Sequence, residues 1–501
     1  MARWEFALPL ERESGVPLFQ QIARAIAADI RRGRLRPGDA LPGTRTLAET
    51  LGVQRLTVVA AFDELRAEGW VVSRSARGTY VSKDLPDPSP RRFAPQRGNV
   101  PGMATRVGFD LEAAPEPELP YDVPRGSLLF APSRPDVRLA PSDLIGRAYR
   151  RAIGRGGGAL LSYASPQGHP RLRDALAAML ASTRGLAATA DNVCITRGSQ
   201  MGIALLARAL VRPGDVVAVE RLGYRPAWEA FRQAGAKVVG VPVDERGLEV
   251  DALERLIAEQ PIRALYVTPH HQFPTTVTLA AGRRIQLLDL ARRHRFAIIE
   301  DDYDHEFHYD GRPVLPLASA DPAGVVAYVG SLSKVLAPAL RIGYVVAPAP
   351  LIERVAAHRS YVDTQGDHVL EHALAELLED GMIQRHIRRV RREYGARRDR
   401  LVSSLREHVG ERVTFTVPAG GIALWVRAAR GGGVDVDAWA RAAKDRGAIM
   451  VTASAYTLDG RSKPYARLGF ASLNAAELDE GVRRLASALR TLVVAGRHSS
   501  P

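Results

Sequence analysis

A proline-rich stretch in the first quarter of the chain most constrains how the chain can fold. Eight prolines lie between Pro86 and Pro120, and no sustained apolar pattern crosses residues 84–124. Proline fixes φ and lacks a backbone N–H, so this composition favours an extended, semi-rigid spacer over a packed layer. The sequence therefore predicts a multidomain protein, with a small domain over residues 11–83, a linker over 84–124 and a large domain over 125–495.

The small domain has the pattern of three helices followed by a β-hairpin. Apolar residues recur at i, i+4 spacing from Leu18 to Ile30, which indicates a helix with one buried face. The expected elements are helices over 16–32, 44–51 (with Thr44 as N-cap) and 55–68, and strands over 69–73 and 78–82. This order is typical of an α+β winged helix-turn-helix.

Four residues of the small domain are candidates for contact with double-stranded DNA. Arg55 begins the second helix of the helix-turn-helix, where Arg55 or Thr57 can read a base edge in the major groove. Arg45 can hold a phosphate, and Arg77, in the hairpin loop, can enter the minor groove or contact the backbone. The alternative is that these are ordinary exposed arginines. Residues 1–83 carry 13 Lys+Arg and 9 Asp+Glu, a net charge of +4, which favours a polyanionic partner.

The small domain also resembles a known family. Residues 41–48 and 65–69, Leu-Pro-Gly-Thr-Arg-Thr-Leu-Ala and Leu-Arg-Ala-Glu-Gly, are similar to the GntR family of DNA-binding domains. Gly43 and Gln54 stand where serine is common in that family.

Lys334 stands out in the large domain because lysine is rare in this chain. Five lysines are present against 64 arginines, and Lys334 ends the run Ser331-Leu332-Ser333-Lys334, seven residues before Arg341. Arginine stays protonated, whereas a desolvated lysine amine can form a Schiff base. Chance survival of one lysine is the alternative interpretation, and the neighbouring motifs weigh against it.

An apolar run upstream, Phe296–Ile299, leads into the acidic cluster 300–304. This is typical of the carboxyl end of a buried parallel strand. Asp301 and Tyr303 share one face of an extended chain, while Asp302 points away. A carboxylate that keeps a pyridine nitrogen protonated and a phenol that bonds a ring hydroxyl suit pyridoxal 5′-phosphate. Taken alone, the cluster is also compatible with a magnesium site or a solvated loop.

Three further segments are compatible with a cofactor site. Residues 195–200 end a short strand, and a helix expected over 201–210 presents its N-terminus, with Ser199 nearby, to a phosphate. Tyr224 can stack on the cofactor ring, although a buried core tyrosine is equally expected there. Arg467 can hold a substrate carboxylate in a bidentate pair.

Together these motifs resemble the fold-type I, PLP-dependent aminotransferases, an α/β fold with a large and a small subdomain. The matching stretches are residues 163–168, 198–200, 268–275, the Asp301/Tyr303 strand and the Lys334/Arg341 element. The resemblance implies that Lys334 is the catalytic Schiff-base lysine, that Asp301 pairs with the pyridine nitrogen and that Tyr303 bonds the ring oxygen. It further implies a phosphate site of Ser199, Ser331, Ser333 and Arg341, cofactor contacts from Gln200 and Tyr224, and Arg467 as the effector carboxylate clamp.

Two segments depart from this family. The family usually has glycine after Phe-Pro-Thr, where this chain has Thr276. The substrate-side segment usually carries a Phe-Pro pair and a tryptophan, where this chain has Leu139-Ala140-Pro141 and Ile145. These departures put the substrate pocket in doubt, and not the cofactor.

A GntR-like reader, a linker and an aminotransferase-like domain in this order resemble the MocR/GabR class of bacterial transcription regulators. The resemblance implies a domain-swapped homodimer that binds an operator and senses PLP, or an amine or amino-acid effector, through a Lys334 Schiff base. The alternative is a working aminotransferase whose reader domain is accessory. A steady-state transaminase assay against a panel of amino acids would distinguish the regulator from the enzyme.

Composition narrows the remaining possibilities. The single cysteine, Cys194, rules out an internal disulfide and fits a reducing cytoplasm, and no apolar run approaches the ~20 residues of a membrane span. The histidines 270, 271, 305 and 308 show no metal-ligand spacing, so no metal is expected. The basic run 385–400 is predicted to be a helix that links the large and small subdomains, and DNA contact is the alternative.

Overall fold

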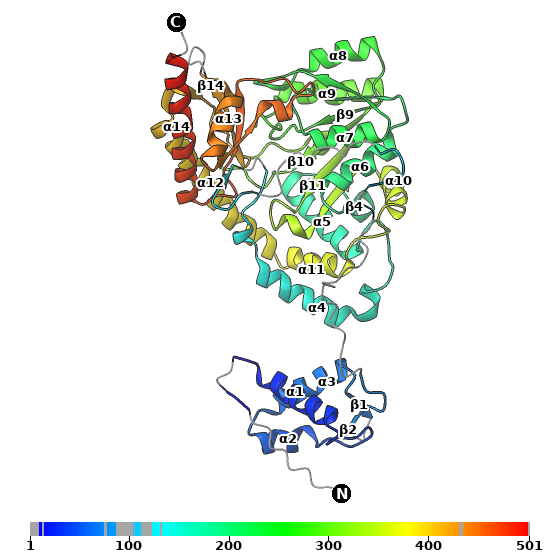
Figure 1. Cartoon of the computed structure of the whole chain (residues 1–501). Coiled ribbons are helices and arrows are strands. Elements are labelled where there is room, and N and C mark those ends of the chain that lie inside the picture. Colours follow the sequence, from blue (N-terminus) through cyan, green and yellow to red (C-terminus); the bar gives the residue numbers. More distant parts are fainter. Residues whose placement is uncertain are drawn as a thin grey trace. The chain divides into compact units, whose positions relative to one another are not determined.

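The computed structural model describes residues 10–12, 15–74, 78–86, 104, 106–111, 123–130, 133–429 and 434–498. The chain divides into two compact units, Met1–Ala114 and Pro115–Pro501 (Figure 1). Much of the expected linker lies outside the described residues, so its bounds stay predictions. In the described ranges, no helix combines the length and apolar character needed to cross a bilayer.

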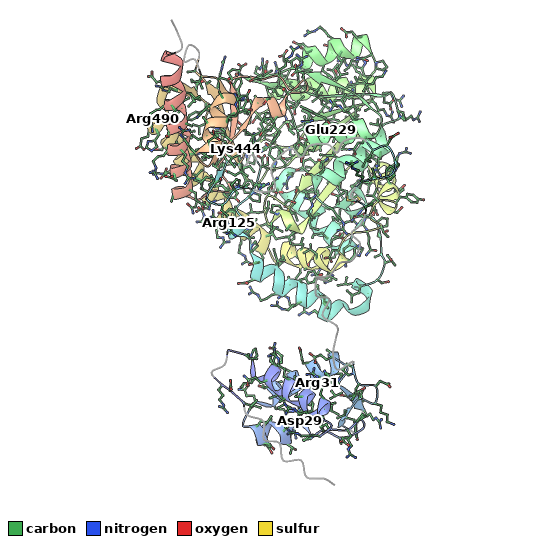
Figure 2. The ribbon with its side chains drawn as sticks, viewed as in Figure 1. Asp29, Arg31, Arg125, Glu229, Lys444 and Arg490 are labelled. Atoms are coloured by element: carbon green, nitrogen blue, oxygen red, sulfur yellow. The ribbon has the colours of Figure 1, made fainter. Side chains whose placement is uncertain are left out.

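The first unit is a winged helix-turn-helix, as predicted. Its elements are α1 (Leu18–Arg31), α2 (Thr44–Leu51), α3 (Arg55–Ala67), β1 (Val71–Arg74) and β2 (Gly78–Val81). The two strands are antiparallel, with Val71 opposite Val81. Apolar faces of α1 and α3 meet in a core that includes Ile26, Phe62 and Trp70. Asp29 and Arg31 project from α1 (Figure 2), and the Arg31 guanidinium lies 4.8 Å from the centroid of the Trp70 ring, against the start of the hairpin.

The expected N-cap at Thr44 was wrong. Thr44 is the first residue of α2, and Gly43 is the N-cap residue, with an extended backbone and no side-chain cap bond. The Thr44 hydroxyl instead accepts a hydrogen bond from Arg55 Nε at 3.3 Å, which ties the two helices of the helix-turn-helix together. The other elements of this unit differ from expectation by one or two residues at their ends.

In the described part of the second unit, seven strands form a sheet in the order β4-β12-β11-β10-β9-β5-β6. Its strands are β4 (Val193–Thr196), β5 (Val216–Glu220), β6 (Lys237–Val241), β9 (Ala264–Val267), β10 (Ala297–Asp302), β11 (Val326–Ser331) and β12 (Gly343–Val346). All neighbours are parallel except β12, which is antiparallel to both β11 and β4. Most residues of these strands are apolar and buried because both faces of the sheet are covered.

Helices pack on both faces of this sheet (Figure 1). Helices α6 (Ser199–Leu210), α7 (Arg225–Gln233) and α10 (Ala349–Ser360) share a core with Val219 and Ile299. Helices α8 (Val250–Glu259) and α9 (Ala281–His294) share another with Ala218 and Ile298. Alternate residues of one strand enter different cores because side chains alternate across a strand. Helices α4 (Ser142–Leu160), α5 (Pro170–Arg184) and α11 (His368–Glu379) complete the layer beside β4 and β12.

A second, antiparallel sheet in the order β13-β14-β17-β16 forms the small subdomain. Its elements, with the helices beside it, are β13 (Val413–Thr414), β14 (Ala423–Ala428), β16 (Val451–Thr452), β17 (Tyr465–Gly469), α12 (Met382–His408), α13 (Val436–Asp445) and α14 (Ala475–His498). Strand pairs β3 (Leu128–Leu129) with β15 (Ala448–Ile449), and β7 (Val243–Asp244) with β8 (Gly247–Leu248), are minor ribbons. The basic run lies on α12, where Arg397, Arg398 and Arg400 are in ion pairs within this unit.

Candidate functional site

A cavity of about 170 Å³ opens beyond the carboxyl ends of the parallel strands. Most of its walls come from the ends of β9 and β10 and from the segments after β4, β5, β9, β10 and β11, because the carboxyl ends of parallel strands meet at one edge of a sheet. Ser133 and Arg134, from the segment before α4, complete them. The lining residues are Ser133, Arg134, Ser199, Tyr224, Tyr266, Thr268, Phe273, Asp301, Tyr303 and Lys334. Five of these were predicted from the sequence as cofactor contacts: Ser199, Tyr224, Asp301, Tyr303 and Lys334.

Asp301 lies at the buried floor of this cavity. Its Oδ2 accepts a hydrogen bond from the Tyr266 hydroxyl at 2.7 Å, and its Oδ1 has no hydrogen-bond partner among the described residues. Burial raises the pKa of Asp301 to about 7, although the Tyr266 hydroxyl and the Lys334 ammonium oppose that rise. Asp302 faces the other way and accepts from the Tyr328 hydroxyl at 2.8 Å, as the strand alternation predicts.

Lys334 extends into the cavity from the segment after β11. Its Nζ donates a hydrogen bond to the carbonyl oxygen of Ser133 at 2.6 Å. Burial lowers the pKa of the amine to about 8, against the attraction of Asp301. An amine with a pKa near 8 is partly neutral at physiological pH, and the neutral form is the nucleophile.

The N-terminus of α6 lies at the other end of the cavity. The helix begins at Ser199, two residues earlier than expected, because Gly198 takes a left-handed φ of 80° as the N-cap. A Cβ at Gly198 would lie 2.8 Å from Arg341 Nη2, so glycine lets the arginine approach the turn. Arg341 Nη2 donates to the carbonyl oxygen of Arg197 at 2.8 Å.

The two serines of the Ser-x-Ser-Lys run are both buried, beside the end of β11. Ser331 Oγ accepts from the Ser333 N–H at 3.1 Å, and Ser333 Oγ has no partner in the described part of the chain. Gln200 turns away instead: its side-chain Nε2 donates to the carbonyl oxygen of Pro226 at 2.8 Å, and it does not line the cavity.

These groups fit the chemistry of a phosphorylated pyridine aldehyde. Asp301 Oδ1 and Ser333 Oγ are buried polar atoms that need a partner, and buried polar atoms are rarely left without one. A helix N-terminus suits a phosphate, and a partly neutral amine suits an aldehyde.

Aromatic rings line one side of the cavity. Tyr224 meets Phe273 edge to face at 5.6 Å between centroids, and Phe273 meets Tyr303 in the same way at 5.9 Å. The Tyr303 hydroxyl donates to the carbonyl oxygen of His271 at 3.0 Å.

Arg467, on β17, is fully buried and lies behind these rings instead of lining the cavity. Its Nη2 donates to the Tyr303 hydroxyl at 3.3 Å, its Nη1 donates to the carbonyl oxygen of Pro274, and its guanidinium lies 4.6 Å from the Phe273 centroid. Its role as a carboxylate clamp stays a prediction.

Thr276, one of the two departures from the aminotransferase pattern, has a left-handed φ of 66°. Glycine adopts this conformation freely, whereas a β-branched residue is strained there by roughly 1–2 kcal/mol. The left-handed φ at this position explains why glycine is usual there in the family, and Thr276 adopts that φ despite the strain.

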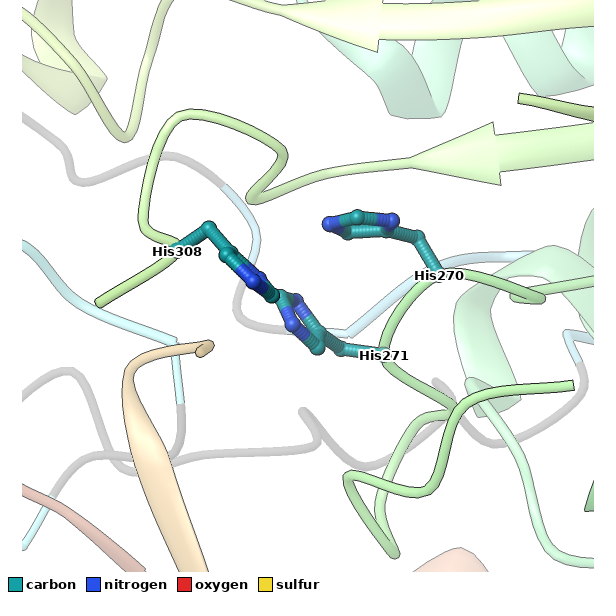
Figure 3. A group of neighbouring side chains, drawn as sticks. All are labelled: His270, His271 and His308. Atoms are coloured by element: carbon teal, nitrogen blue, oxygen red, sulfur yellow. The ribbon is translucent and has the colours of Figure 1, made fainter. Parts of the chain in front are cut away.

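Four histidines gather around the loop whose His271 carbonyl accepts the Tyr303 hydrogen bond. His270 and His271 lie on the loop after β9, and His308 lies on the segment after β10 (Figure 3). The His270 ring also stacks on His305, with centroids 4.7 Å apart. The sequence offered no ligand spacing here because the fold, and not the local sequence, brings these two segments together.

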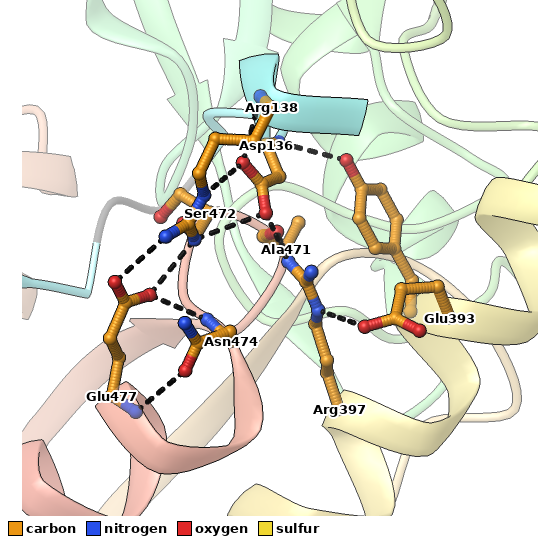
Figure 4. A network of polar contacts seen from close by, with 9 residues as sticks. Asp136, Arg138, Glu393, Arg397, Ala471, Ser472, Asn474 and Glu477 are labelled. Atoms are coloured by element: carbon orange, nitrogen blue, oxygen red, sulfur yellow. Dashed lines mark hydrogen bonds and ion pairs between the residues drawn. The ribbon is translucent and has the colours of Figure 1, made fainter. Parts of the chain in front are cut away.

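A polar network fixes the segment that carries Ser133 and Arg134 (Figure 4). The buried Asp136 accepts from Arg138 Nε at 2.8 Å and from Arg397 Nη1 at 2.9 Å. Arg138 reaches Glu477 near the start of α14 at 2.8 Å, and Arg397 Nη1 reaches the carbonyl oxygen of Ala471 at 2.6 Å. The network thus holds the Ser133 carbonyl, the partner of Lys334, to α12 and α14.

In the first unit, the candidate DNA contacts lie on the helix-turn-helix. Arg45 and Arg55 are exposed at the first turns of α2 and α3, and Thr57 is half-buried on α3. Leu56, beside Arg55, is 76% exposed and is a further candidate for DNA contact. The sequence did not predict it, because a leucine is known to be exposed only once the buried face of the helix is known. Arg77 lies outside the described residues.

Comparison with known proteins identifies both units. The model for aminotransferase class I and II matches residues 141–485, and that for bacterial regulatory proteins of the gntR family matches residues 18–81. The chain is 33% identical over 489 residues, 98% of this chain and 97% of the relative, to the probable rhizopine catabolism regulatory protein MocR of Rhizobium meliloti. It is 32% identical over 400 residues, 79% of this chain and 80% of the relative, to the HTH-type pyridoxine biosynthesis transcriptional regulator PdxR of Corynebacterium glutamicum.

Among solved structures, the multiple substrate aminotransferase of Thermococcus profundus superposes with a TM-score of 0.68 at 29% identity, covering 73% of this chain and 92% of that chain. The second unit therefore has the fold of PLP-dependent aminotransferases.

Proposed function

Because this chain belongs to the MocR/GabR type of helix-turn-helix transcriptional regulators, we propose that it couples operator binding to pyridoxal 5′-phosphate (PLP) held in its aminotransferase-like unit. The observation that carries the proposal is the convergence of Asp301, Tyr303, Lys334 and the α6 N-terminus on one cavity. Bound PLP would supply an aldehyde that reacts with amines and a ring that withdraws electrons.

Each residue of the cavity would have a separate task. Lys334 would hold the cofactor covalently through its partly neutral amine. Asp301 would accept a hydrogen bond from the protonated ring nitrogen on Oδ1, which has no partner among the described residues. Tyr303 would donate to the ring oxygen by exchanging its present bond to the His271 carbonyl. The α6 N-terminus would hold the phosphate, and Tyr224 would pack against the ring. The phosphate contacts in this proposal are Ser199, Ser331, Ser333 and Arg341.

Regulation requires an effector that binds one conformation more tightly than another. The candidate effectors are PLP itself and an amine or amino acid that competes with Lys334 for the cofactor. An effector carboxylate would reach Arg467 only if that guanidinium exchanged its bonds to Pro274 and Tyr303. We place the regulator in the cytoplasm as a domain-swapped homodimer, whose two reader domains would occupy two half-sites.

The first test is DNA binding by the purified full-length protein to the intergenic region upstream of its own gene, titrated with and without PLP at fixed salt. The proposal expects a specific complex whose affinity or footprint changes with PLP. A specific complex that responds only after an amine is added would assign the effector role to that amine. Competition by unrelated DNA at equal strength would refute the operator-binding proposal.

Lys334→Ala tests the assignment of the lysine. We expect loss of borohydride-stable PLP attachment, because the amine is gone, with operator binding retained, because the reader domain is untouched. Lys237→Ala, which removes an exposed lysine on β6, is the control and should leave both properties unchanged. PLP still attached to Lys334→Ala at one equivalent would contradict the assignment.

A second function, transamination, is favoured by the likeness to solved aminotransferases and by the presence of every cofactor-site residue type. Turnover of a panel of amino acids with a keto-acid acceptor would test it. Measurable steady-state turnover abolished by Lys334→Ala would establish an enzyme that also carries a reader domain.

A further inference from the structure

Three histidines of the second unit form a compact group beside the cofactor cavity. His270, His271 and His308 each offer a ring nitrogen within 4.8 Å of the others. They come from two segments, the loop after β9 and the segment after β10, that the sheet brings face to face (Figure 3). Neither segment contributes to the cavity through these rings, so the group has no role in the proposed cofactor chemistry.

His271 is already oriented as metal-binding histidines usually are. Its Nδ1 lies 2.7 Å from Asp304 Oδ1, and both side chains are buried. A carboxylate on one ring nitrogen fixes the tautomer and leaves the other nitrogen, Nε2, as a lone-pair donor. Gly420 keeps the space beside that nitrogen open, because a Cβ there would lie 2.6 Å from Nε2.

The buried imidazole of His270 has no hydrogen-bond partner among the described residues. It is 4% exposed, and neither ring nitrogen has a hydrogen-bond partner within the described ranges. Nδ1 of His308 is likewise buried and has no hydrogen-bond partner among the residues that the structure describes. A neutral imidazole has one nitrogen with a free lone pair, and a buried lone pair without a partner is unfavourable, so a ligand that accepts it is favoured.

We propose that His270, His271 and His308 form a site for a divalent transition metal ion. The ion is Zn²⁺, because Zn²⁺ binds imidazole nitrogen well and has no fixed geometric preference. Three protein ligands leave a fourth tetrahedral position for water or an exogenous ligand. Zinc–nitrogen bonds of about 2.0–2.1 Å place the nitrogens roughly 3.3 Å apart, so the rings must turn inward on binding. His308 can make this movement because it is only half-buried, and it lines a surface cavity with Tyr309 and Arg398 through which an ion can reach it.

The site would connect to the cofactor cavity through one residue. The Tyr303 hydroxyl donates to the carbonyl oxygen of His271, so an ion on His271 would stabilise the loop that holds Tyr303. Metal binding is nevertheless separate from the proposed cofactor role, and it is measured without reference to DNA binding or turnover.

The test uses the untagged full-length protein, first stripped with chelator and then titrated with Co²⁺, followed by Zn²⁺ competition against a chromophoric chelator. We expect one equivalent of Co²⁺ with the intense visible bands of a tetrahedral site, displaced by one equivalent of Zn²⁺. The double variant His270→Gln/His308→Gln should weaken Zn²⁺ binding at least 100-fold.

The matched control is His372→Gln. His372 belongs to another histidine group, in which its ring centroid lies 5.0 Å from that of His169. Both of its ring nitrogens already have partners, Arg171 Nη1 at 3.0 Å and His169 Nε2 at 3.4 Å. The control should bind Zn²⁺ like the wild type. No tetrahedral Co²⁺ spectrum, or equal weakening in the control and the double variant, would overturn the proposal. Circular dichroism and PLP binding check that the double variant folds.

Discussion

At the scale of single residues, Tyr266 orients the carboxylate at the floor of the cavity. Its hydroxyl donates to Asp301 Oδ2 at 2.7 Å, which leaves Oδ1 free for a ligand. Tyr266→Phe should raise the dissociation constant of PLP about tenfold, because a hydrogen bond to a charged group contributes roughly 1.5–3 kcal/mol. PLP titration of the cofactor-free protein, followed by absorbance, measures the change.

Tyr328→Phe is the control for this prediction. Tyr328 makes the same kind of bond to Asp302, on the opposite face of β10. Its loss should leave PLP affinity unchanged. Equal weakening by both substitutions would mean that Tyr266 acts only through the stability of the strand.

Glu220 makes stability depend on pH. It is buried at the end of β5, where its Oε2 accepts from the Thr268 N–H at 3.1 Å and from the Thr268 hydroxyl at 2.7 Å. Burial raises its pKa from 4.5 to about 7, although the bonds from Thr268 oppose this. Between these values the folded state binds one proton more than the unfolded state, so the free energy of unfolding falls as pH rises.

Glu220→Gln should remove this contribution, because the amide keeps an acceptor for Thr268 and cannot ionise. The contribution is about 3 kcal/mol over the whole window, from roughly 1.4 kcal/mol per pH unit. Urea unfolding of wild type and variant between about pH 5 and pH 7 measures it. The free energy of unfolding of the variant, relative to that of the wild type, should increase as pH rises. Parallel pH profiles for the two proteins would contradict the assignment.

At the scale of elements, Asp136 holds the Ser133–Arg138 segment against α12 and α14 (Figure 4). Asp136→Ala should destabilise the second unit by about 3 kcal/mol, because it leaves the buried Arg397 guanidinium without its buried carboxylate. The urea midpoint followed by tryptophan fluorescence reports this loss. Glu393→Ala removes the other, half-exposed partner of Arg397 and should cost under about 1 kcal/mol. Equal losses would show that the network is not centred on Asp136.

Elements with strong periodicity or continuous apolar runs could be predicted from the sequence. The run Phe296–Ile299 required a buried strand, and period-two alternation then placed Asp301 and Asp302 on opposite faces. Element ends differ from the predicted ones: α6 begins at Ser199 because Gly198 adopts φ 80°, and Thr44 is helical instead of capping. A sequence does not show which of several adjacent polar residues takes the cap.

Contacts between distant segments could not be predicted from the sequence. Tyr266 belongs to no motif that the sequence shows, and only the fold brings its hydroxyl to Asp301. Arg467 was one arginine among 64, and only the packing of β17 behind Tyr303 makes it fully buried. His270 and His308 are 38 residues apart in the sequence, and only the fold brings their rings together.

At the scale of the whole molecule, the chain has two units with separate cores, and we expect operator binding in the first and ligand binding in the second. Substitutions in the cavity should change ligand response before they change operator affinity, and substitutions on α2 and α3 should do the reverse. Arg45 and Arg55 test the second half of this statement, because both are exposed arginines at helix starts and differ in the groups of DNA that they are expected to contact.

Arg45→Ala should lower affinity for operator and for unrelated DNA alike, because a phosphate contact carries no sequence information. It should also reduce the slope of log K against log salt by about 1 for each protomer bound. Arg55→Ala should instead cost roughly 1–3 kcal/mol on the operator and little on unrelated DNA, because a base-edge contact is lost. Fluorescence anisotropy at several salt concentrations, on operator and scrambled duplexes, separates the two effects. If both variants lose affinity equally on the two duplexes, Arg55 contacts the backbone and base recognition must come from another residue of α3.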